Sequence, residues 1–390
     1  MRGSRSGCES KHTSTTLMIL LLLVLLLQLI GCSPSLNVGV IAGLTGTQSE
    51  LGVAGRNGAL FRFEEENARR GMNRFVLSME DDQNNPERVP EIAERFRKAG
   101  VSVVIGPFTS TIALAVTTEE PDLLFVSPTA SAMRLAGLDD MLVRLMGSAE
   151  AAAKSLAQEM KKRYNLNSIA VVWDINNSIY AEDYLEAFSS GWGADTGWWL
   201  NEATATEGRQ GVLSGRCFDA KLSSEVHEAA CFLVDSGADS VLIIASGTNT
   251  ASIIRMLRRE NYEGLIMVAG WAITSDLSEW GTETLEGVVF SQQYDPAFIG
   301  PQFVEFQNKY MDRFGTAPSF GAIFGYEAAE LVIRAMDNSS RLDALGLKRS
   351  ILSLDPFEAL QGSLHLDSFG DPQRGVYQFQ FCSGLPVRLE

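Results

Sequence analysis

The feature that most constrains the fold is a regular alternation of short apolar segments with helical ones, which begins at residue 37. The first apolar segments read NVGVIAGL, RFVLSMED, VSVVIGPF and DLLFVSP. Each of the first three is followed by a run with the spacing of an amphipathic helix, such as PERVPEIAERFRKAG. Buried β-branched strands that alternate with helices are typical of βαβ units around a parallel sheet with both faces covered.

The alternation restarts after a break at VRLMGS (143–148). A helix over 149–164 leads to SIAVVWD, and SVLIIASG and LIMVAGWA follow as further strands, with helices between them. We also expect a strand at WWLNEATAT (198–206). The sequence therefore predicts an α/β protein with two doubly wound parallel-sheet lobes.

The C-terminal part departs from this alternation. LEGVVFSQQYD precedes two helices, predicted over 301–314 and 325–336. The tail GSLHLDSFGDPQRGVYQFQF predicts an antiparallel hairpin with a Gly-Asp turn. No Pro-rich linker separates the two halves, so we expect the lobes to be joined by several hinge strands.

Size and charge agree with two lobes and exclude one class of partner. A chain of 390 residues exceeds what one ordinary core holds. Its hydrophobic content of 45% and charged content of 21% are those of a globular protein. A net charge of −16 argues against nucleic acid as a partner, because little here would neutralise a phosphate backbone.

The N-terminus reads as an export signal. Basic residues precede the apolar run LMILLLLVLLL, which is too short for a comfortable membrane helix. LIGC (Leu29–Cys32) is similar to the bacterial lipobox, where signal peptidase II cuts before a lipid-modified Cys. We therefore expect removal of residues 1–31 and a lipid on Cys32, which anchors the exported protein to a bacterial membrane, facing periplasm or cell exterior. The alternative is a plain signal peptide with an incidental Cys.

The cysteines give no sign of enzyme activity, and the known catalytic motifs are missing from the sequence. Three cysteines follow Cys32 in the chain: Cys217, Cys231 and Cys382. Because three is an odd number, at most one disulfide forms among them. A bond from Cys217 to Cys231 and buried free thiols both stay open. The sequence has no GxSxG, HExxH, Walker or strand-following GxGxxG motif, and EDDQNNPE reads as a helix-capping turn. We expect no enzyme activity, no catalytic residue, no cofactor and no metal ion.

Two neighbouring strands end in the same way. VIGPFTST (104–111) and LLFVSPTASA (123–132) each place a Pro and then small hydroxyl residues at a strand end. Ligands of open parallel sheets bind beyond the carboxyl ends of the strands, where unpaired N–H groups and helix dipoles favour an anion. The sequence predicts a carboxylate-binding cradle here; the alternative is that the hydroxyls only cap their own helices. The four hydroxyls are Ser110, Thr111, Thr129 and Ser131.

The order of several segments resembles a known family. GVIAGLTGTQSELGVAGRNGALFRFEEEN, MEDDQNNPE, VIGPFTST, VSPTAS and GVVFSQQYD are similar to the branched-chain amino-acid-binding (Leu/Ile/Val-binding) branch of the periplasmic binding proteins of fold type I. The resemblance implies two lobes, linked by three crossovers, that close on a small solute and deliver it to an ABC permease.

The resemblance also implies positions for the binding site. Ser110 and Ser131 match the hydroxyls that hold a ligand carboxylate, with backbone from Ala130. Leu51 matches a side chain of the N-terminal lobe, and the other lobe's wall would include Tyr180, Asn249 and Trp271.

One position departs from the family pattern. Trp271 falls close to where amino-acid-binding members have an acidic residue for the ligand ammonium. Asp174 or Asp276 would have to replace that acidic residue, so an aromatic or aliphatic carboxylate competes with an α-amino acid as the ligand.

These observations together predict a function. We expect lobe I to comprise 36–147 and 294–372, and lobe II 148–293 and 373–390. The protein would be a lipid-anchored substrate-binding component of an ABC importer that captures an amino acid or related small carboxylate and contacts the permease subunits. The alternative is a ligand-sensing or regulatory lipoprotein of the same fold, acting on a membrane or cell-wall partner.

Overall fold

The computed structural model describes residues 35–46, 49–119, 122–194, 213–274, 277 and 281–389. The export signal, Cys32 and the strand expected at 198–206 lie outside the described residues. In the described part of the chain, no helix is long and apolar enough to cross a membrane.

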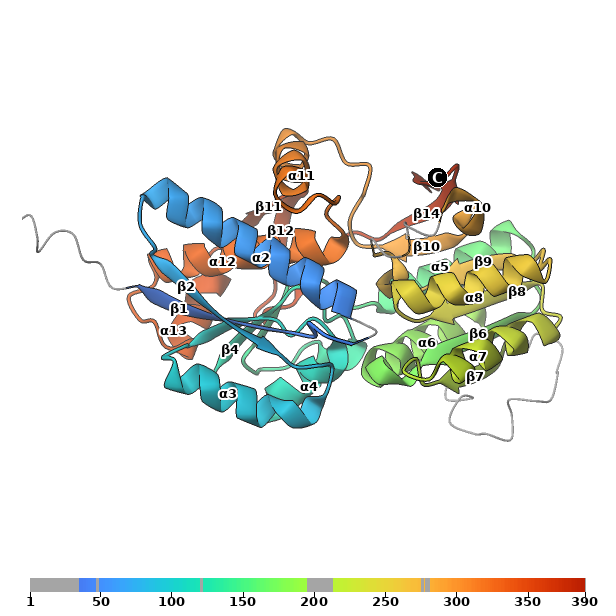
Figure 1. Ribbon diagram of the computed structural model, residues 1–390, viewed down its shortest axis with the longest axis horizontal. Helices are drawn as coiled ribbons and strands as arrows, with labels where there is room; N and C mark the ends of the chain where they lie inside the picture. Colours follow the sequence, from blue (N-terminus) through green and yellow to red (C-terminus); the bar gives the residue numbers. More distant parts are fainter. Residues whose placement is uncertain are drawn as a thin grey trace, which may run out of the picture.

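The first lobe is built on five parallel strands in the order β2-β1-β3-β4-β5. These strands are β1 (Leu36–Ala42), β2 (Phe75–Asp81), β3 (Val103–Ile105), β4 (Leu124–Ser127) and β5 (Leu142–Arg144). Helices cover both faces of the sheet (Figure 1): α2 (Ser49–Arg70) and α12 (Phe320–Asn338) lie on one side, and α3 (Val89–Lys98) and α4 (Ser110–Glu119) on the other.

Strand β3 shows why these segments read as unbroken apolar runs. Val103 and Ile105 belong to the core beneath α2 and α12, whereas Val104 packs in the cluster of Ile92 and Ile112 from α3 and α4. Because neighbouring side chains of a strand point to opposite faces, a sheet covered on both faces requires apolar residues at every position.

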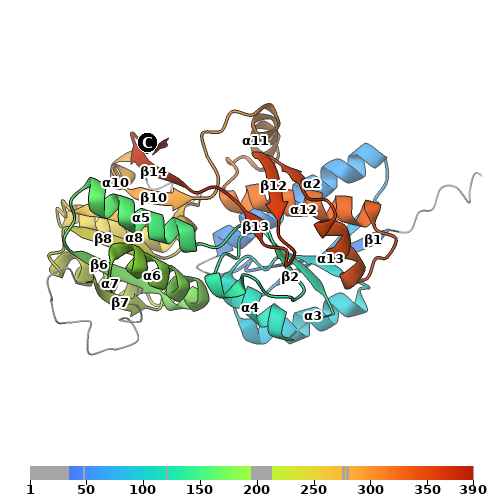
Figure 2. The same cartoon turned by 180° about the vertical axis from the view of Figure 1, so that it is seen from behind.

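The second lobe has a seven-stranded sheet in the order β15-β14-β10-β9-β8-β6-β7. Its strands from β7 to β10 are parallel, whereas β14 and β15 pair antiparallel at one edge. Helices α7 and α8 cover one face (Figure 1) and α5 and α6 the other (Figure 2). The elements are α5 (Glu150–Arg163), β6 (Ile169–Asp174), α6 (Ser178–Trp192), β7 (Leu213–Phe218), α7 (Ser223–Asp235), β8 (Ser240–Ile244), α8 (Gly247–Arg259), β9 (Leu265–Val268), α10 (Thr282–Leu285), β10 (Val289–Gln292), β14 (Tyr377–Cys382) and β15 (Leu385–Arg388).

The predicted fold class, α/β with two doubly wound lobes, is confirmed. The sequence reading missed β7 and the helix at Ala344–Leu352. Further elements complete the fold. They are 3-10 helices η1 (Pro86–Arg88), η2 (Met133–Leu135), η3 (Ile175–Asn177) and η6 (Gly270–Ala272), helices α11 (Pro301–Phe314) and α13 (Ala344–Leu352), and strands β11 (Phe357–Ala359), β12 (Gly362–Leu366) and β13 (Pro372–Gln373).

The C-terminal hairpin prediction was wrong in part. Strand β12 pairs antiparallel with β13 across a turn that contains Gly370, as expected, but β13 ends at Gln373. Strand β14 then leaves for the second lobe and pairs with β10. A tail read only for local turn signals cannot reveal that its last strand completes a different sheet.

The cysteines of the described residues are free thiols. Cys217 and Cys382 are exposed, and Cys231 is half-buried. The structure therefore has no bond between Cys217 and Cys231, and the thiols are not the buried groups that the sequence suggested.

The chain passes between the two lobes three times, and side chains tie these crossovers together. The Gln293 amide accepts a hydrogen bond from the Gly147 N–H (2.7 Å) and donates to the Gly147 carbonyl (2.9 Å). Arg374 donates to the Leu145 carbonyl (2.6 Å) and pairs with buried Glu327 (2.6 Å). The predicted residue limits of the two lobes stay a prediction.

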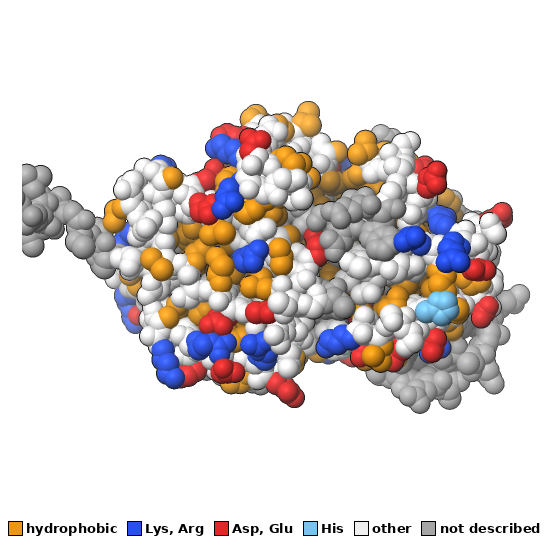
Figure 3. All heavy atoms as spheres, viewed as in Figure 1, with side chains coloured by type: hydrophobic (Ala, Val, Ile, Leu, Met, Phe, Trp, Pro, Cys, Tyr) orange, Lys and Arg blue, Asp and Glu red, His pale blue; other side chains and the backbone are white. Residues whose placement is uncertain are grey.

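Charges of both signs are interspersed over both lobes on the face seen in Figure 3. Many form pairs on the surface, such as Arg95 with Glu80 (2.8 Å) and Arg97 with Asp122 (2.7 Å). That face therefore offers no continuous basic patch of the kind that holds nucleic acid.

Helices α2 and α12 cross at backbone contact, and an ion cluster closes one end of that contact. A Cβ on Gly58 would lie 2.0 Å from the Ala322 carbonyl oxygen, so only glycine allows the approach. Further along α2, buried Glu66 pairs with Arg69 (2.5 Å), Arg70 (2.7 Å) and Arg62 (3.0 Å). Hydrogen bonds from Arg69, Arg62 and Arg70 outweigh burial and lower the pKa of Glu66 to about 2.

We expect Glu66→Gln to lower the free energy of unfolding by about 3 kcal/mol, because the largely buried guanidinium groups of Arg62 and Arg70 lose their shared carboxylate. The Glu66 carboxylate stabilises the fold above its unfolded pKa of about 4.3, and this stabilisation is lost as pH falls toward the folded value. Urea unfolding at pH 7 and at pH 3 measures both effects, and the difference between wild type and variant should shrink at pH 3.

The matched control is Glu94→Gln, which removes an exposed carboxylate near Lys98 (3.4 Å) and should cost less than about 0.5 kcal/mol. Equal losses in the two variants would contradict the role given to the Glu66 cluster.

Candidate functional site

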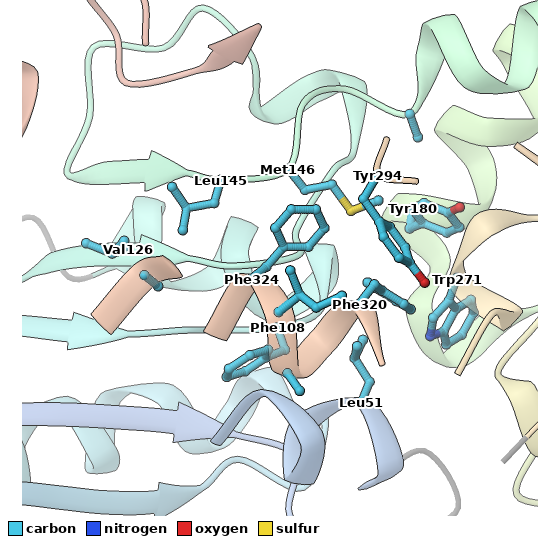
Figure 4. Close-up of a cluster of buried hydrophobic side chains, with 14 of the residues drawn as sticks. Leu51, Phe108, Val126, Leu145, Met146, Tyr180, Trp271, Tyr294, Phe320 and Phe324 are labelled. Atoms are coloured by element: carbon cyan, nitrogen blue, oxygen red, sulfur yellow. The ribbon is translucent and has the colours of Figure 1, made fainter. Parts of the chain in front are cut away.

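A small cavity lies where the two lobes meet. Its first-lobe side chains come from α2, α12, the ends of β3 and β4, and the chain just after β5; its second-lobe side chains come from η3, α6 and η6. In Figure 4 the apolar members are part of a cluster of buried hydrophobic side chains that come from both lobes. The lining residues are Leu51, Phe108, Ser110, Thr129, Ser131, Met146, Asn177, Tyr180, Trp271 and Phe320.

Most of the residues predicted from the sequence line this one cavity: Leu51, Ser110, Thr129, Ser131, Tyr180 and Trp271. Three do not. Thr111 bonds to Asn177 behind the cavity wall, Ala130 is fully buried, and the Asn249 amide donates to the Ser246 hydroxyl (2.9 Å) within the second lobe.

Hydroxyl groups tie the two strand ends to each other. The Ser110 oxygen accepts hydrogen bonds from the N–H groups of Ser131 (3.2 Å) and Ala132 (3.1 Å). Thr129 donates its hydroxyl proton to the Phe108 carbonyl (2.5 Å). The loop after β4 is therefore held against the loop after β3 at three points.

Two of the sequence expectations for these loops are wrong. The N–H groups of 130–132 are not unpaired, because serine oxygens accept from each of them, Ser127 from Ala130 (3.2 Å) and Ser110 from the other two. Ser110 does not cap its own helix, because its oxygen bonds across to the neighbouring loop. The groups that can meet a ligand are hydroxyl protons and not backbone N–H groups of this loop.

Ser131 differs from its neighbours. Its side chain is buried, with 2% exposed, but among the described residues no hydrogen bond of its hydroxyl is found. Ser110 keeps a free proton as well, since both of its bonds are accepted ones. Two hydroxyl donors of the first lobe therefore remain available at the cavity.

A buried arginine supports this wall from behind. Arg144, at the end of β5 and 1% exposed, donates to the Ala132 carbonyl (3.1 Å) and pairs with Asp371 (2.6 Å). Its charge is thus satisfied inside the lobe, and it fixes the loop without lining the cavity.

The second-lobe wall is aromatic. The rings of Tyr180 and Trp271 meet edge to face, with centroids 5.8 Å apart. Burial raises the pKa of the Tyr180 hydroxyl, although its hydrogen bond with the Trp271 backbone opposes that shift. Tyr180 therefore stays a neutral hydroxyl at every physiological pH.

Among the described lining residues, none carries a charge. Asp174 does not reach the cavity: it is fully buried and accepts bonds from the Asn176 N–H (3.0 Å), the Asn176 amide (2.7 Å) and the Ala220 N–H (3.3 Å). Burial raises the pKa of the Asp174 carboxyl. Asp276, the other candidate partner for an ammonium, lies outside the described residues.

Side chains also bridge the lobes beside the cavity. The Asn177 amide oxygen accepts from the Thr111 hydroxyl (3.3 Å) and N–H (3.4 Å). Arg134 of η2 donates its backbone N–H (2.9 Å) and its guanidinium (2.7 Å) to Asp183 of α6. These contacts join surfaces that move apart whenever two lobes open.

The sequence reading missed four lining residues: Phe108, Met146, Asn177 and Phe320. Phe108 lies inside the strand-end motif VIGPFTST, and Asn177 follows the end of β6, so the strand-end rule applied to every strand would have found both. Phe320 begins α12 far along the chain and carries no such signal.

Comparison with known proteins gives the following likenesses. A family model described as "Periplasmic binding protein" matches residues 35–384. The Leu/Ile/Val-binding protein BraC3 of Rhizobium johnstonii is 30% identical over 161 residues, which cover 40% of this chain and 43% of that protein. The Leu/Ile/Val-binding protein homolog 2 of Brucella abortus is 22% identical over 364 residues, with 89% of this chain and 90% of the relative covered.

Solved structures share the fold over nearly the whole chain. The substrate-binding protein LivJ of Streptococcus pneumoniae in complex with isoleucine has a TM-score of 0.77 at 17% identity, covering 91% of this chain and 100% of that chain. A solute-binding protein from R. palustris in complex with benzoate also has a TM-score of 0.77 at 17% identity, covering 91% and 96%.

From the hydrogen-bond pattern, we expect Ser110→Ala to lower the free energy of unfolding by about 2 kcal/mol, since two buried N–H groups lose their acceptor. Ser131→Ala, which removes no bond, should cost less than about 1 kcal/mol. Urea unfolding of both variants without ligand measures the difference. Equal costs would contradict the tie between the two loops.

The bridge between Arg134 and Asp183 should favour the closed arrangement of the lobes. We expect Arg134→Gln to increase the radius of gyration of ligand-free protein in small-angle X-ray scattering, because Asp183 then loses its charged partner across the cleft and keeps only the backbone N–H of residue 134. Arg259→Gln, the same charge change on an exposed face of α8, is the control. An unchanged radius in Arg134→Gln would show that the bridge does not hold the lobes together.

Proposed function

The chain belongs to the periplasmic binding protein family, whose model matches residues 35–384, and we propose on this premise that it is the solute-binding component of an ABC importer. It captures an amino acid or a related small carboxylate in the cavity between the lobes and performs no chemical reaction. The observation that carries the proposal is the convergence of both lobes on one cavity lined with hydroxyl and aromatic side chains.

The ligand carboxylate would be held at the first-lobe wall. Ser131 and Ser110 offer free hydroxyl protons there, and the ten-residue helix α4 begins at Ser110, so its positive end faces the same region. Thr129 would hold the loop in place but would not donate to the ligand, since its hydroxyl already donates to the Phe108 carbonyl. Solved relatives in fold bind isoleucine and benzoate, and both ligands carry a carboxylate.

Closure of the cleft would couple binding to transport. A ligand that touches both lobes stabilises the closed form by its differential affinity for that form over the open one. The crossovers tied by Gln293 and Arg374 supply the hinge, and the Arg134–Asp183 pair adds a direct contact between lobes. An ABC permease would read the closed form, and the lipid on Cys32 would keep the protein at the outer face of a bacterial membrane beside it.

A thermal-shift screen of amino acids and small carboxylates tests the proposal, because a ligand at a hundred times its dissociation constant adds about 2.7 kcal/mol to stability. For a carboxylate that binds, Ser131→Ala should weaken affinity tenfold to a hundredfold, since a hydrogen bond to a charged group contributes about 1.5–3 kcal/mol. Isothermal titration calorimetry gives both dissociation constants.

Ser224→Ala, at an exposed position of α7, is the control and should bind as the wild type does. If Ser131→Ala binds with wild-type affinity, the carboxylate is not held at this wall.

A further inference from the structure

We infer that the ligand is a small monocarboxylate with an apolar body and no ammonium group. This inference rests on the proposed function and narrows it to one of the two ligand classes that the proposal includes. It is drawn from the hydrogen-bonding groups that the cavity still has available once the protein's own bonds are formed.

The available groups are mainly donors. The Ser110 oxygen already accepts two N–H bonds, so its proton is what it offers a ligand. Asn177 uses its amide oxygen on Thr111, which leaves the amide protons for the cavity. The Ser131 hydroxyl adds a third donor, and carboxylate oxygens are the acceptors that such a set suits.

Acceptors for an ammonium are few. Thr129 keeps only its oxygen lone pairs, and no lining carboxylate is present among the described residues. Two acidic residues of the second lobe already have partners: Asp174 accepts bonds from Asn176 in its own loop and from Ala220 after β7, and Asp183 pairs with Arg134. An ammonium has three donors and a full positive charge, so burying it here without a counter-charge is costly.

The rest of the lining suits an apolar body. Leu51, Phe108, Met146 and Phe320 form the first-lobe side, and Trp271 faces them from the second lobe (Figure 4). These side chains leave only a small cavity between the lobes, which limits the ligand to a small molecule.

The test compares ligands that differ only in the ammonium group. One pair is 3-phenylpropionate and L-phenylalanine, and the other is 4-methylpentanoate and L-leucine, so that an aromatic and an aliphatic body are both sampled. 2-Phenylethylamine, which has the ammonium and lacks the carboxylate, is the fifth probe. Calorimetry on the full chain gives each dissociation constant.

We expect the compound without the ammonium to bind more than about tenfold more tightly than its amino acid, since an ammonium buried without acceptors loses its hydration and gains no hydrogen bonds. Equal or tighter binding of the amino acids overturns the inference and leaves the proposed function standing. Binding of 2-phenylethylamine alone, or of none of the five, overturns the proposed function and the inference together.

A second variant tests the same point from the protein side. Asn177→Asp keeps the size of the side chain but replaces amide donors with a carboxylate in the cavity wall. We expect it to shift the ratio of the two affinities more than about tenfold toward the amino acid. Asn308→Asp, an identical charge change at an exposed position of α11, should leave the ratio unchanged; an unchanged ratio in Asn177→Asp overturns the inference.

The variant Asp276→Asn provides a further test of the inference. If wild type prefers the amino acids and Asp276→Asn abolishes that preference, the ammonium has a partner in that residue and the inference is wrong. If Asp276→Asn leaves the preference for the compounds without an ammonium unchanged, the inference is supported.

Discussion

Hydrogen bonds from side-chain hydroxyls to the backbone of two neighbouring strand ends are the interactions on which the site depends. Ser127 donates to the Pro107 carbonyl (2.6 Å), Thr129 donates to the Phe108 carbonyl, and the Ser110 oxygen accepts from the loop after β4. These bonds consume the backbone groups that an open strand end would otherwise expose. What remains for a ligand is a set of hydroxyl and amide protons held in fixed positions, which lowers the cost of ordering them on binding.

The proposed anionic ligand is compatible with the acidic charge of the protein. The chain has a net charge of −16, yet the charged groups near the cavity are paired within the protein: Arg144 with Asp371, and Arg134 with Asp183. At physiological ionic strength, exposed charges beyond about 8 Å are largely screened. Under the proposed function, local donors and the start of α4 would therefore select the ligand, and the net charge would have little influence inside the cavity.

The sequence predicted much of the fold and part of the site, for one physical reason. Buried strands with helices between them have a periodicity that is readable locally, and the rule that ligands bind at strand ends pointed to Ser110, Thr129 and Ser131, which line the cavity. The family resemblance supplied the other three predicted lining residues, Leu51, Tyr180 and Trp271. Phe320 was out of reach because it arrives through the crossing of α12 on α2, which depends on glycines far apart in the chain. The pairing of β14 with β10 and the bonds of Ser110 were equally hidden, since both depend on tertiary contacts.

The two sets of contacts between the lobes differ in kind, and this difference is what allows a binding protein to be a switch. Gln293 and Arg374 bond to backbone carbonyls within the crossovers themselves, so these bonds can persist while the lobes rotate. The Arg134–Asp183 and Thr111–Asn177 contacts join opposite rims and exist only when the rims meet. Each rim contact stabilises closure without ligand and so raises the fraction of molecules already competent to bind, which tightens apparent affinity. Under the proposed function, rims that bound too strongly would close the protein with or without a ligand, and the ligand could then no longer decide the equilibrium.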